Sequence, residues 1–356
     1  MGGISRYALQ LIQALAQVPG DENYTVFRSR KDSANYIAPE ENRFTAKKLW
    51  TPSHHRLEKW ALAAELLPHK IDVFHSPDFI PPANGTFRRI ITVHDLTFLH
   101  YPEFLTPDSR RYYSDQIRWA VTAADHIAAD SEATRKDLID LLDVPAAKVT
   151  TIHLAAEPVH TVDYLPDAID QSLSKYGLSR GFILNVGTLE PRKNIPTLLR
   201  AYHRIREDKR IDPLLVLVGS KGWIYNDIFQ EINSLGLSES VRHLESVSDI
   251  ELAHLYRAAG VLAFPSFYEG FGLPALEAMH AGCPIVASQR GSLVEVVGNA
   301  GLLLDPDDVN SWIEALESIL TDSSLAAELA KAGRQQAGQF SWLKTAKATL
   351  SLYRNG

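Results

Sequence analysis

Two glutamates in one short segment carry the residue pattern best suited to chemistry. Glu269 and Glu277 stand eight positions apart in FPSFYEGFGLPALEAMHAG, residues 264–282. Pro274 lies between them and favours the first turn of a helix, where an N–H would have no partner. We therefore expect Glu269 to precede a turn and Glu277 to lie near the start of a helix. One carboxylate can then hold sugar hydroxyls and the other a ribose diol.

The residues between the two glutamates favour an anionic ligand. Their backbone amides would point at the ligand, with the positive end of the helix dipole behind them. The four residues that we expect to line this loop are Gly270, Phe271, Gly272 and Leu273.

Two adjacent cations form a second candidate group. Arg192 and Lys193 follow a strand and Gly187 in NVGTLEPRKN, residues 185–194. A fork-shaped guanidinium beside a point-like ammonium suits a diphosphate. A solvated loop with two exposed bases is an equally good interpretation of this segment alone. In LVGSKGW, residues 217–223, Lys221 between two glycines is open to the same two interpretations.

These segments must be positioned by an alternation of strands and helices. The first half contains the β-rich runs YTVF, DVFHS, RRIITVHD, HIAADS and KVTTIHL, and the second half contains GFILNVGT, LLVLVGS, VRHLES, GVLAFPS, PIVAS and GLLLD. Helical patterns separate the runs, which predicts two parallel sheets covered by helices on both faces. The rhythm breaks near residues 157–175, and only helices are expected after about residue 308. Ligands of such sheets bind where the strands end.

The motifs together resemble glycosyltransferase family 4 along nearly the whole chain. They are GTLEPRKN, LVGSKGW, YEGFGLPALEAM and VSDIELAHLYRAA, residues 247–259. The resemblance implies the GT-B fold, an α/β architecture of two doubly wound Rossmann-like domains facing a cleft. It places an acceptor-side domain at 1–165, a nucleotide-sugar domain at 166–340, and a C-terminal helix at 341–356 that crosses back. Bacterial α-mannosyltransferases are the nearest likeness within the family.

The resemblance also implies a role for each candidate. Arg192 and Lys193 would grip the donor pyrophosphate, Glu269 the transferred sugar and Glu277 the nucleotide ribose. The stretch along the base would include Val247 and Asp249. The catalytic candidates are Glu269, His94, Arg192 and Lys193, and the donor-binding candidates are Gly3, Gly187, Arg192, Lys193, Val247, Asp249, Glu269, Gly270, Phe271, Gly272, Leu273 and Glu277.

The first half of the chain contains fewer candidate functional residues. His94 ends the strand of RRIITVHD, followed by Asp95, and in the family pattern it faces the cleft near the sugar and acceptor. A lone histidine is more often structural, but its place at a strand end favours a functional role. Ser131 and Glu132 match another strand-end segment of the family. They would serve equally well as a helix N-cap and its first-turn acid.

The start of the chain departs from the family pattern. Family members begin with a buried strand that leads into a glycine loop facing the donor phosphates, whereas here Gly2 and Gly3 follow Met1 directly. We therefore expect a shortened chain that lacks the central strand between Tyr24–Phe27 and Val73–Ser76. Those two strands should then lie about 9–10 Å apart, twice the normal ladder spacing, rather than pair directly.

Composition excludes several classes. The net charge is −7 over 356 residues, which gives no general attraction to nucleic acid. The single cysteine, Cys283 in an apolar run, excludes an internal disulfide framework and fits a reducing compartment. No apolar run reaches the length of a membrane span, and the start lacks a signal sequence. We expect a cytoplasmic protein.

Two motifs imitate other functions. Gly270, Gly272 and Ala275 satisfy the dinucleotide fingerprint, but the next strand ends at Ser288 instead of an acid. The run 305–307, Asp-Pro-Asp, imitates the D-x-D of metal-dependent transferases, but its place before a helix favours a turn and an N-cap. We expect no metal site.

The expected reaction is transfer of a hexose, with retention, to a glycan or lipid-linked acceptor in polysaccharide or glycolipid synthesis. GDP-mannose is favoured as donor over UDP-glucose on family likeness alone, with no cofactor besides the nucleotide sugar. The open alternatives are a UDP-glucose-type transferase, a GT-B nucleotide-sugar epimerase, and a non-catalytic nucleotide-sugar binder. A phosphorylase would need a lysine carrying pyridoxal phosphate, and no motif marks one.

A basic stretch, residues 43–70, is a candidate for peripheral contact with an anionic membrane at the inner face. It interleaves lysines and arginines with Trp50, Trp60, His54, His55 and His69. Five of its residues recur at helical spacing and are expected to pack inward instead: Leu57, Trp60, Ala61, Ala64 and Leu67.

Overall fold

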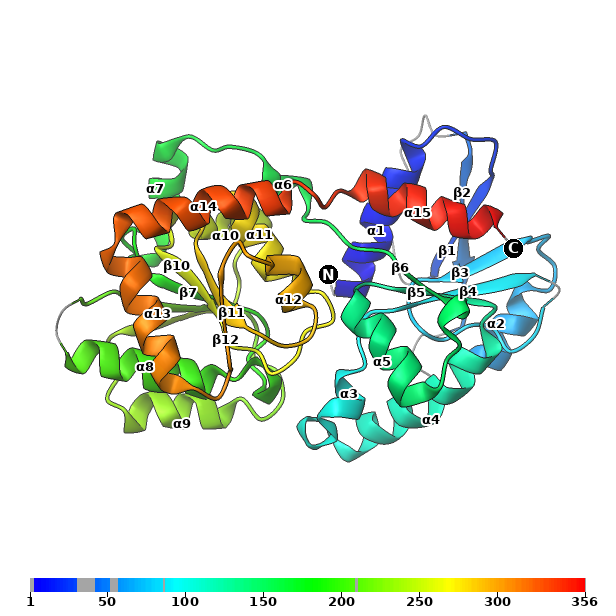
Figure 1. Ribbon diagram of the computed structural model, residues 1–356. Helices are drawn as coiled ribbons and strands as arrows, with labels where there is room; N and C mark the ends of the chain where they lie inside the picture. The colour runs from blue at the N-terminus through cyan, green and yellow to red at the C-terminus, as the bar shows by residue number, and fades with distance from the viewer. Residues whose placement is uncertain (1–2, 31–41, 52–56, 86, 209–210, 356) are drawn as a thin grey trace. The chain divides into compact units, whose positions relative to one another are not determined.

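A computed structural model describes residues 3–30, 42–51, 57–85, 87–208 and 211–355. The chain divides into two compact units. Unit 1 contains Met1–Leu154 together with Ser341–Gly356, and unit 2 contains Ala155–Phe340. Both units are α/β structures with parallel sheets, coloured in chain order in Figure 1.

Unit 1 is built on a four-stranded parallel sheet in the order β3-β4-β5-β6. Its strands are β3 (Val73–Ser76), β4 (Arg88–Val93), β5 (His126–Ala129) and β6 (Val149–Thr151). Two further strands, β1 (Tyr24–Ser29) and β2 (Phe44–Leu49), form a separate parallel pair. The helices are α1 (Gly3–Ala16), α2 (Glu58–Leu66), α3 (Thr97–His100), α4 (Pro107–Ala123), α5 (Glu132–Leu142) and α15 (Trp342–Arg354), with short 3-10 turns at Pro102–Phe104 and Ala146–Lys148.

The strands on either side of the expected gap do not pair with each other. Among the described residues, β1 bonds only to β2, and β3 bonds only to β4. Their side chains nevertheless approach, since the rings of Phe27 and Phe74 lie 6.5 Å apart between centroids. The absence of direct pairing agrees with the prediction, while the spacing between the strands stays a prediction. Strand β2 was not predicted, because its exposed, lysine-containing sequence lacks an apolar run.

The C-terminal helix α15 packs on α1 within unit 1 (Figure 1). The rings of Tyr7 and Trp342 lie 6.2 Å apart between centroids. The Thr345 hydroxyl donates to the carbonyl of His153 at 2.6 Å, which ties α15 to the residues after β6. Helix α15 thus belongs to the unit that also contains the N-terminus.

Unit 2 is a six-stranded parallel sheet in the order β12-β11-β10-β7-β8-β9. Its strands are β7 (Ile183–Val186), β8 (Leu215–Val218), β9 (Val241–Leu244), β10 (Val261–Phe264), β11 (Ile285–Ser288) and β12 (Leu302–Leu304). The chain runs outward from β7 to β9 and then returns to place β10 beside β7. This reversal is the switch point at which doubly wound sheets bind ligands.

Helices cover both faces of the unit 2 sheet (Figure 1). One layer contains α8 (Ile195–Glu207), α9 (Asn226–Ser234) and α13 (Val309–Thr321). The other contains α6 (Pro158–Thr161), α7 (Pro166–Tyr176), α10 (Asp249–Ala258), α11 (Leu273–Ala281), α12 (Leu293–Val297) and α14 (Ser323–Ala337). Because both faces are covered, every residue of β7, β8, β10 and β11 is buried.

The division between the units differs from the predicted boundary at residue 165. Unit 2 begins at Ala155, because α6 packs against α10 and α11 rather than against the first sheet. His160 of α6 is fully buried, and Arg257 of α10 donates to its carbonyl at 3.1 Å.

The expectation that five residues of the basic stretch pack inward is wrong. Leu57, Trp60 and Leu67 are 60%, 55% and 77% exposed, and Ala61 and Ala64 are exposed as well. The buried face of α2 consists instead of Leu62, Ala63 and Leu66, and the two leucines pack with Phe87. Both sets recur at helical spacing, so periodicity could not tell which one faces the core.

Candidate active site

The two strongest candidate segments meet at the switch point of unit 2. Arg192 and Lys193 lie on a short 3-10 turn, Pro191–Lys193, just beyond β7, and Glu269 follows the neighbouring strand β10. The amide of Phe267 donates to the carbonyl of Arg192 at 2.8 Å, which joins the two loops. The pairing of β7 with β10 therefore brings together residues that stand more than seventy positions apart.

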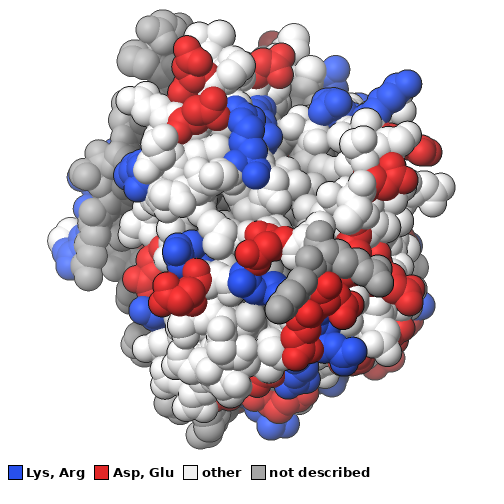
Figure 2. Space-filling model, turned by 90° about the vertical axis from the view of Figure 1, so that its left-hand side faces the viewer, with Lys and Arg blue, Asp and Glu red and all other residues white. Residues whose placement is uncertain are grey.

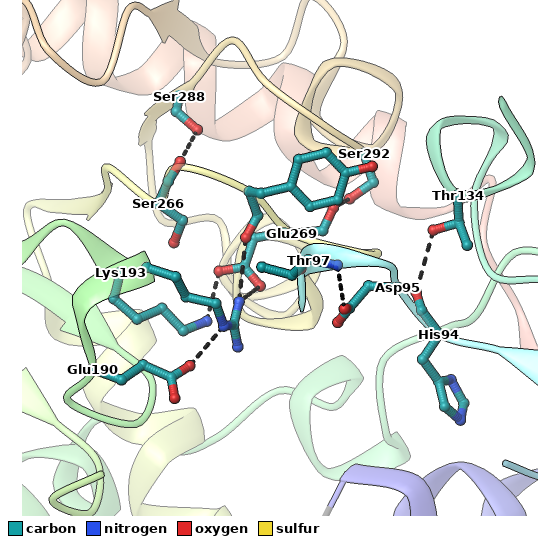
Figure 3. A network of polar contacts seen from close by, with 12 residues as sticks. His94, Asp95, Thr97, Thr134, Glu190, Lys193, Ser266, Glu269, Ser288 and Ser292 are labelled. Carbon is teal, nitrogen blue, oxygen red and sulfur yellow. Dashed lines mark hydrogen bonds and ion pairs between the residues drawn. The ribbon is translucent and has the colours of Figure 1, made fainter. Parts of the chain in front are cut away.

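Glu269 forms ion pairs with both cations (Figure 3). Its carboxylate accepts from Arg192 Nη1 at 2.9 Å and from Lys193 Nζ at 2.6 Å. Arg192 also pairs with Glu190 through Nε at 2.6 Å. Of the four side chains only that of Arg192 is appreciably exposed, at 23%. The predicted sugar ligand and the predicted pyrophosphate ligands thus form one charged cluster.

The Glu269 carboxylate stays ionised at neutral pH. Burial by itself raises the pKa of Glu269, but the charges of Arg192 and Lys193 outweigh it and lower that pKa to about 2. Burial, together with the charge of Arg192, lowers the pKa of Lys193, and Glu269 opposes this shift. A buried charged cluster with one partly exposed cation is suited to exchange partners with an incoming anion.

The loop after Glu269 has the predicted form. Gly272 is the N-cap of α11 with φ of +88°, a left-handed conformation that favours glycine, and Pro274 lies in the first turn. The carbonyl of Glu269 accepts from Ser292, from its amide at 3.2 Å and from its hydroxyl at 2.9 Å. The segment from Gly270 to Leu273 therefore leads into the positive end of α11.

The glycines that follow β7 and β8 allow the two loops to approach closely. A Cβ on Gly219, where φ is +148°, would lie 2.0 Å from the carbonyl oxygen of Gly187. Lys221, which follows β8, pairs with Glu245 at 3.0 Å. Its charge is thus already partnered, which favours the structural interpretation of LVGSKGW.

Glu277 is buried on α11, apart from the ion cluster. Its carboxylate accepts from the Tyr256 hydroxyl at 2.9 Å, and the closest nitrogen of His160 lies 3.6 Å away. Val247 lies in the loop between β9 and α10, and Asp249 is the first residue of α10, whose N-terminus is capped by a capping box of Ser248 and Glu251. The sequence analysis missed Tyr256, although it lies within the motif of residues 247–259, and His160, which belongs to no recognisable motif.

In unit 1, both ring nitrogens of His94 are occupied. Nδ1 lies 2.6 Å from the carboxylate of Asp130, and Nε2 lies 2.9 Å from the carbonyl of Pro77. Burial alone would lower the pKa of His94, but the charge and hydrogen bond of Asp130 raise it to about 9. At neutral pH the ring is an imidazolium that donates both N–H groups, so it has no lone pair with which to act as a base. Asp130, at the end of β5, was missed by the sequence analysis.

Three other candidates of unit 1, Asp95, Ser131 and Glu132, have structural partners. Asp95 accepts from the amide of Thr97 at 2.9 Å (Figure 3). Ser131 caps α5 by accepting from the amide of Thr134, and Glu132 bonds to Arg135 and Thr151, so the N-cap interpretation is correct. Gly3 is the first residue of α1 and has open space around it. Gly2 lies outside the described residues.

Comparison with known proteins identifies the family. The family model of Glycosyltransferase Family 4 matches residues 1–158, and the family model of Glycosyl transferases group 1 matches residues 171–336. O-antigen chain mannosyltransferase B of Escherichia coli is 34% identical over 375 residues, which cover 99% of this chain and 96% of that protein. The chain belongs to glycosyltransferase family 4.

Solved structures share the fold of this glycosyltransferase. Sucrose-phosphate synthase from Thermosynechococcus elongatus superposes with a TM-score of 0.80 at 23% identity, covering 99% of this chain and 93% of that one. HepE of Anabaena, solved with UDP and glucose, gives 0.77 at 19% identity, covering 100% and 96%. The architecture is therefore GT-B.

The run 305–307, which resembles a metal-binding D-x-D, and the apparent dinucleotide fingerprint have ordinary structural roles in this glycosyltransferase. Asp305 and Asp307 both pair with Arg290, at 3.1 and 3.2 Å, and Asp308 caps α13. The hydroxyl of Ser288, where a dinucleotide fold would need an acid, donates to the carbonyl of Ser266 at 2.5 Å (Figure 3). Within the described ranges, no group of three or more His, Cys, Asp or Glu side chains is arranged to hold a metal ion.

Proposed function

We propose that this glycosyltransferase transfers mannose from GDP-mannose, with retention, to a glycan or lipid-linked acceptor in polysaccharide or glycolipid synthesis. The observation that carries the proposal is the cluster of Arg192, Lys193 and Glu269 at the switch point of unit 2. The choice of mannose rests on the similarity to an O-antigen mannosyltransferase. The proposal needs no cofactor besides the nucleotide sugar.

The proposed mechanism relies on positioning and on charge stabilisation. Arg192, Lys193 and the positive end of α11 would stabilise the negative charge that grows on the leaving diphosphate. The leaving phosphate itself would take the proton of the acceptor hydroxyl, on the same face of the sugar. The mechanism assigns no general base to His94, since its ring is protonated at neutral pH.

Binding of the donor would change the partners of the cluster. The pyrophosphate would compete with Glu269 for Arg192 and Lys193, since all three groups are in contact without it. A carboxylate released in this way could accept hydrogen bonds from the sugar hydroxyls. Glu277, which is not paired with either cation, would hold the ribose instead.

The nucleotide preference is tested by thermal unfolding in the presence of GDP or UDP. We expect GDP to raise the melting temperature at lower concentration than UDP does. A ligand at a hundred times its Kd stabilises the native state by about 2.7 kcal/mol, which is readily measured. A clear preference for UDP would replace GDP-mannose by a UDP-hexose donor. Turnover of the selected nucleotide sugar separates a transferase from a binder without activity.

We also propose that unit 1 contacts an anionic membrane surface through α2 and β2. Trp50, Leu57, Trp60 and Leu67 are each more than half exposed, which places large apolar side chains in water. The exposed cations Lys47, Lys48 and Lys70 belong to the same stretch, so an anionic lipid surface matches both its charge and its apolar side chains. The location would then be the cytoplasmic face of the membrane.

Not every base of this stretch is available to lipid. Arg43 donates to the carbonyls of Ala16, Val18 and Gly20 at the end of α1. His54 and His55 lie outside the described residues. Among the helices of the described residues, none is both long and apolar enough to cross a membrane.

Flotation with anionic vesicles tests the surface contact. We expect Trp60→Ser with Leu67→Ser to lower binding by about tenfold or more, since each buried CH₂ contributes about 0.8 kcal/mol. Leu165→Ser is the matched control, because Leu165 is 76% exposed but lies in unit 2. High salt should weaken binding of the unchanged protein. No binding at low salt would refute the contact.

The face drawn in Figure 2 shows no broad area of a single charge among its described residues. Figure 2 shows one face of the molecule, on which acidic and basic side chains lie beside each other and large areas carry neither. With a net charge of −7, the protein has no general attraction to nucleic acid.

A further inference from the structure

A buried histidine lies behind the proposed ribose ligand. The side chain of His160 is fully buried, and neither of its ring nitrogens has a hydrogen-bond partner. Its Nε2 lies 3.6 Å from Oε1 of Glu277, and its ring meets that of Tyr256 edge to face at 5.8 Å between centroids. Buried polar atoms without partners are rare and costly, so this arrangement calls for a function.

The backbone around His160 is held firmly. The guanidinium of Arg257 donates to the carbonyls of His160 and Val162, which anchors α6 against α10. Helix α6 also packs on α11, the helix that carries Glu277. The ring therefore approaches Glu277 from a fixed position.

The two oxygens of Glu277 face different neighbours. Oε2 accepts from the Tyr256 hydroxyl at 2.9 Å, while Oε1 faces Nε2 of His160 without a formed hydrogen bond. A carboxylate that binds a diol must present both oxygens in one orientation, and its rotation about the last side-chain bond is soft. A second donor on the protein side would fix that rotation.

We propose that His160 is a positioning residue for the nucleotide donor: its Nε2–H, together with the Tyr256 hydroxyl, orients the carboxylate of Glu277 toward the ribose diol. The inference rests on the proposed function, in which Glu277 holds the ribose. His160 touches Glu277 and not the reacting atoms, so its effect falls on donor binding rather than on the chemical step.

The test compares the binding of GDP with that of its 2′,3′-dideoxy analogue, or of the UDP pair if the titration above selects UDP. His160→Phe keeps a ring but removes the donor, and His160→Gln keeps an N–H close to the position of Nε2. We expect His160→Phe to weaken GDP binding by about tenfold, the scale of one hydrogen bond to a charged group, which Nε2–H would form with Glu277 when the donor binds. The dideoxy analogue should bind this variant and the unchanged protein equally. His160→Gln should restore most of the GDP affinity.

Two controls separate positioning from structural damage. His254→Phe removes another buried histidine of unit 2, which bonds to Ser172, and should leave the GDP affinity unchanged. At saturating donor, His160→Phe should keep its kcat while KM for the donor rises. In a Glu277→Gln background, His160→Phe should have no further effect on GDP binding.

The possible outcomes distinguish this inference from the proposed function. If His160→Phe weakens both nucleotides equally, or if His254→Phe has the same effect, the positioning role is refuted. If Glu277→Gln abolishes the preference for GDP over the dideoxy analogue but His160→Phe does not reduce it, only the role of His160 fails. If Glu277→Gln leaves that preference unchanged, Glu277 does not hold the ribose, and both assignments fail.

Discussion

Replacing Glu269 with alanine is expected to abolish glycosyl transfer and to destabilise unit 2. The carboxylate is buried against Arg192 and Lys193, so its removal leaves the buried ammonium of Lys193 without its closest anion. Breaking a buried pair in this way typically costs about 3–5 kcal/mol. Turnover of the nucleotide sugar and chemical unfolding measure the two effects separately. A variant with near-normal kcat would show that Glu269 does not act on the transferred sugar.

Glu277→Ala is the matched comparison for this prediction. It should mainly raise KM for the donor, because in the proposed function Glu277 reaches the ribose and not the sugar. Glu269→Gln adds a check through pH, since it keeps the size of the side chain. The pKa of Glu269 is lowered from 4.5 to about 2, so the stability from its charge is present above pH 4.5 and is lost as pH falls toward 2. The stability difference between Glu269→Gln and the unchanged protein should shrink over that range.

Lys193→Ala is expected to lower kcat by about 10²–10³, the scale found when one group that stabilises transition-state charge is removed. Lys193 is the buried cation of the cluster, and its Nζ donates to Glu269 at 2.6 Å. Lys193→Arg should not restore activity, because the end of the Lys193 side chain lies close against Gly187. A Cβ built on Gly187 would be only 3.1 Å from Cε of Lys193, so there is little room for the larger guanidinium. Steady-state kinetics with the selected donor measure both variants.

Arg200→Ala is the control for Lys193→Ala. Arg200 lies on α8 of the same unit and forms an exposed pair with Glu231 at 2.8 Å. Exposed pairs contribute little, so this variant should keep both its activity and its melting temperature. A Lys193→Ala variant that matched it in kcat would exclude Lys193 from stabilising the leaving diphosphate.

Local sequence signals were sufficient for every strand except β2 and for the motif of the site. All eleven β-rich runs contain strands of the structure, and the four strands that are buried on both faces, β7, β8, β10 and β11, consist mostly of apolar residues. The turn after Glu269 and the helix that begins beside Pro274 also follow from local preferences. Proline restricts the backbone dihedral angles at its own position, and glycine allows a wider range of them.

Other features were decided only by tertiary structure. The contact of Glu269 with both Arg192 and Lys193 depends on β10 pairing with β7. The local sequence pattern predicts where strands occur but not their order in the sheet. The inward face of α2 depended on which of two apolar stripes met Phe87.

The partners of His94 and Glu277 likewise could not be predicted from the sequence. Neither Asp130 nor His160 was predicted as a partner, and each acquires its role through a neighbour distant in the chain. The sequence by itself determined which residue types stand at the ends of strands and the starts of helices, because those depend on the nearest few residues. The folded structure determined which of these groups share a charge or a hydrogen bond, because such contacts join residues that only the packing of whole elements brings together.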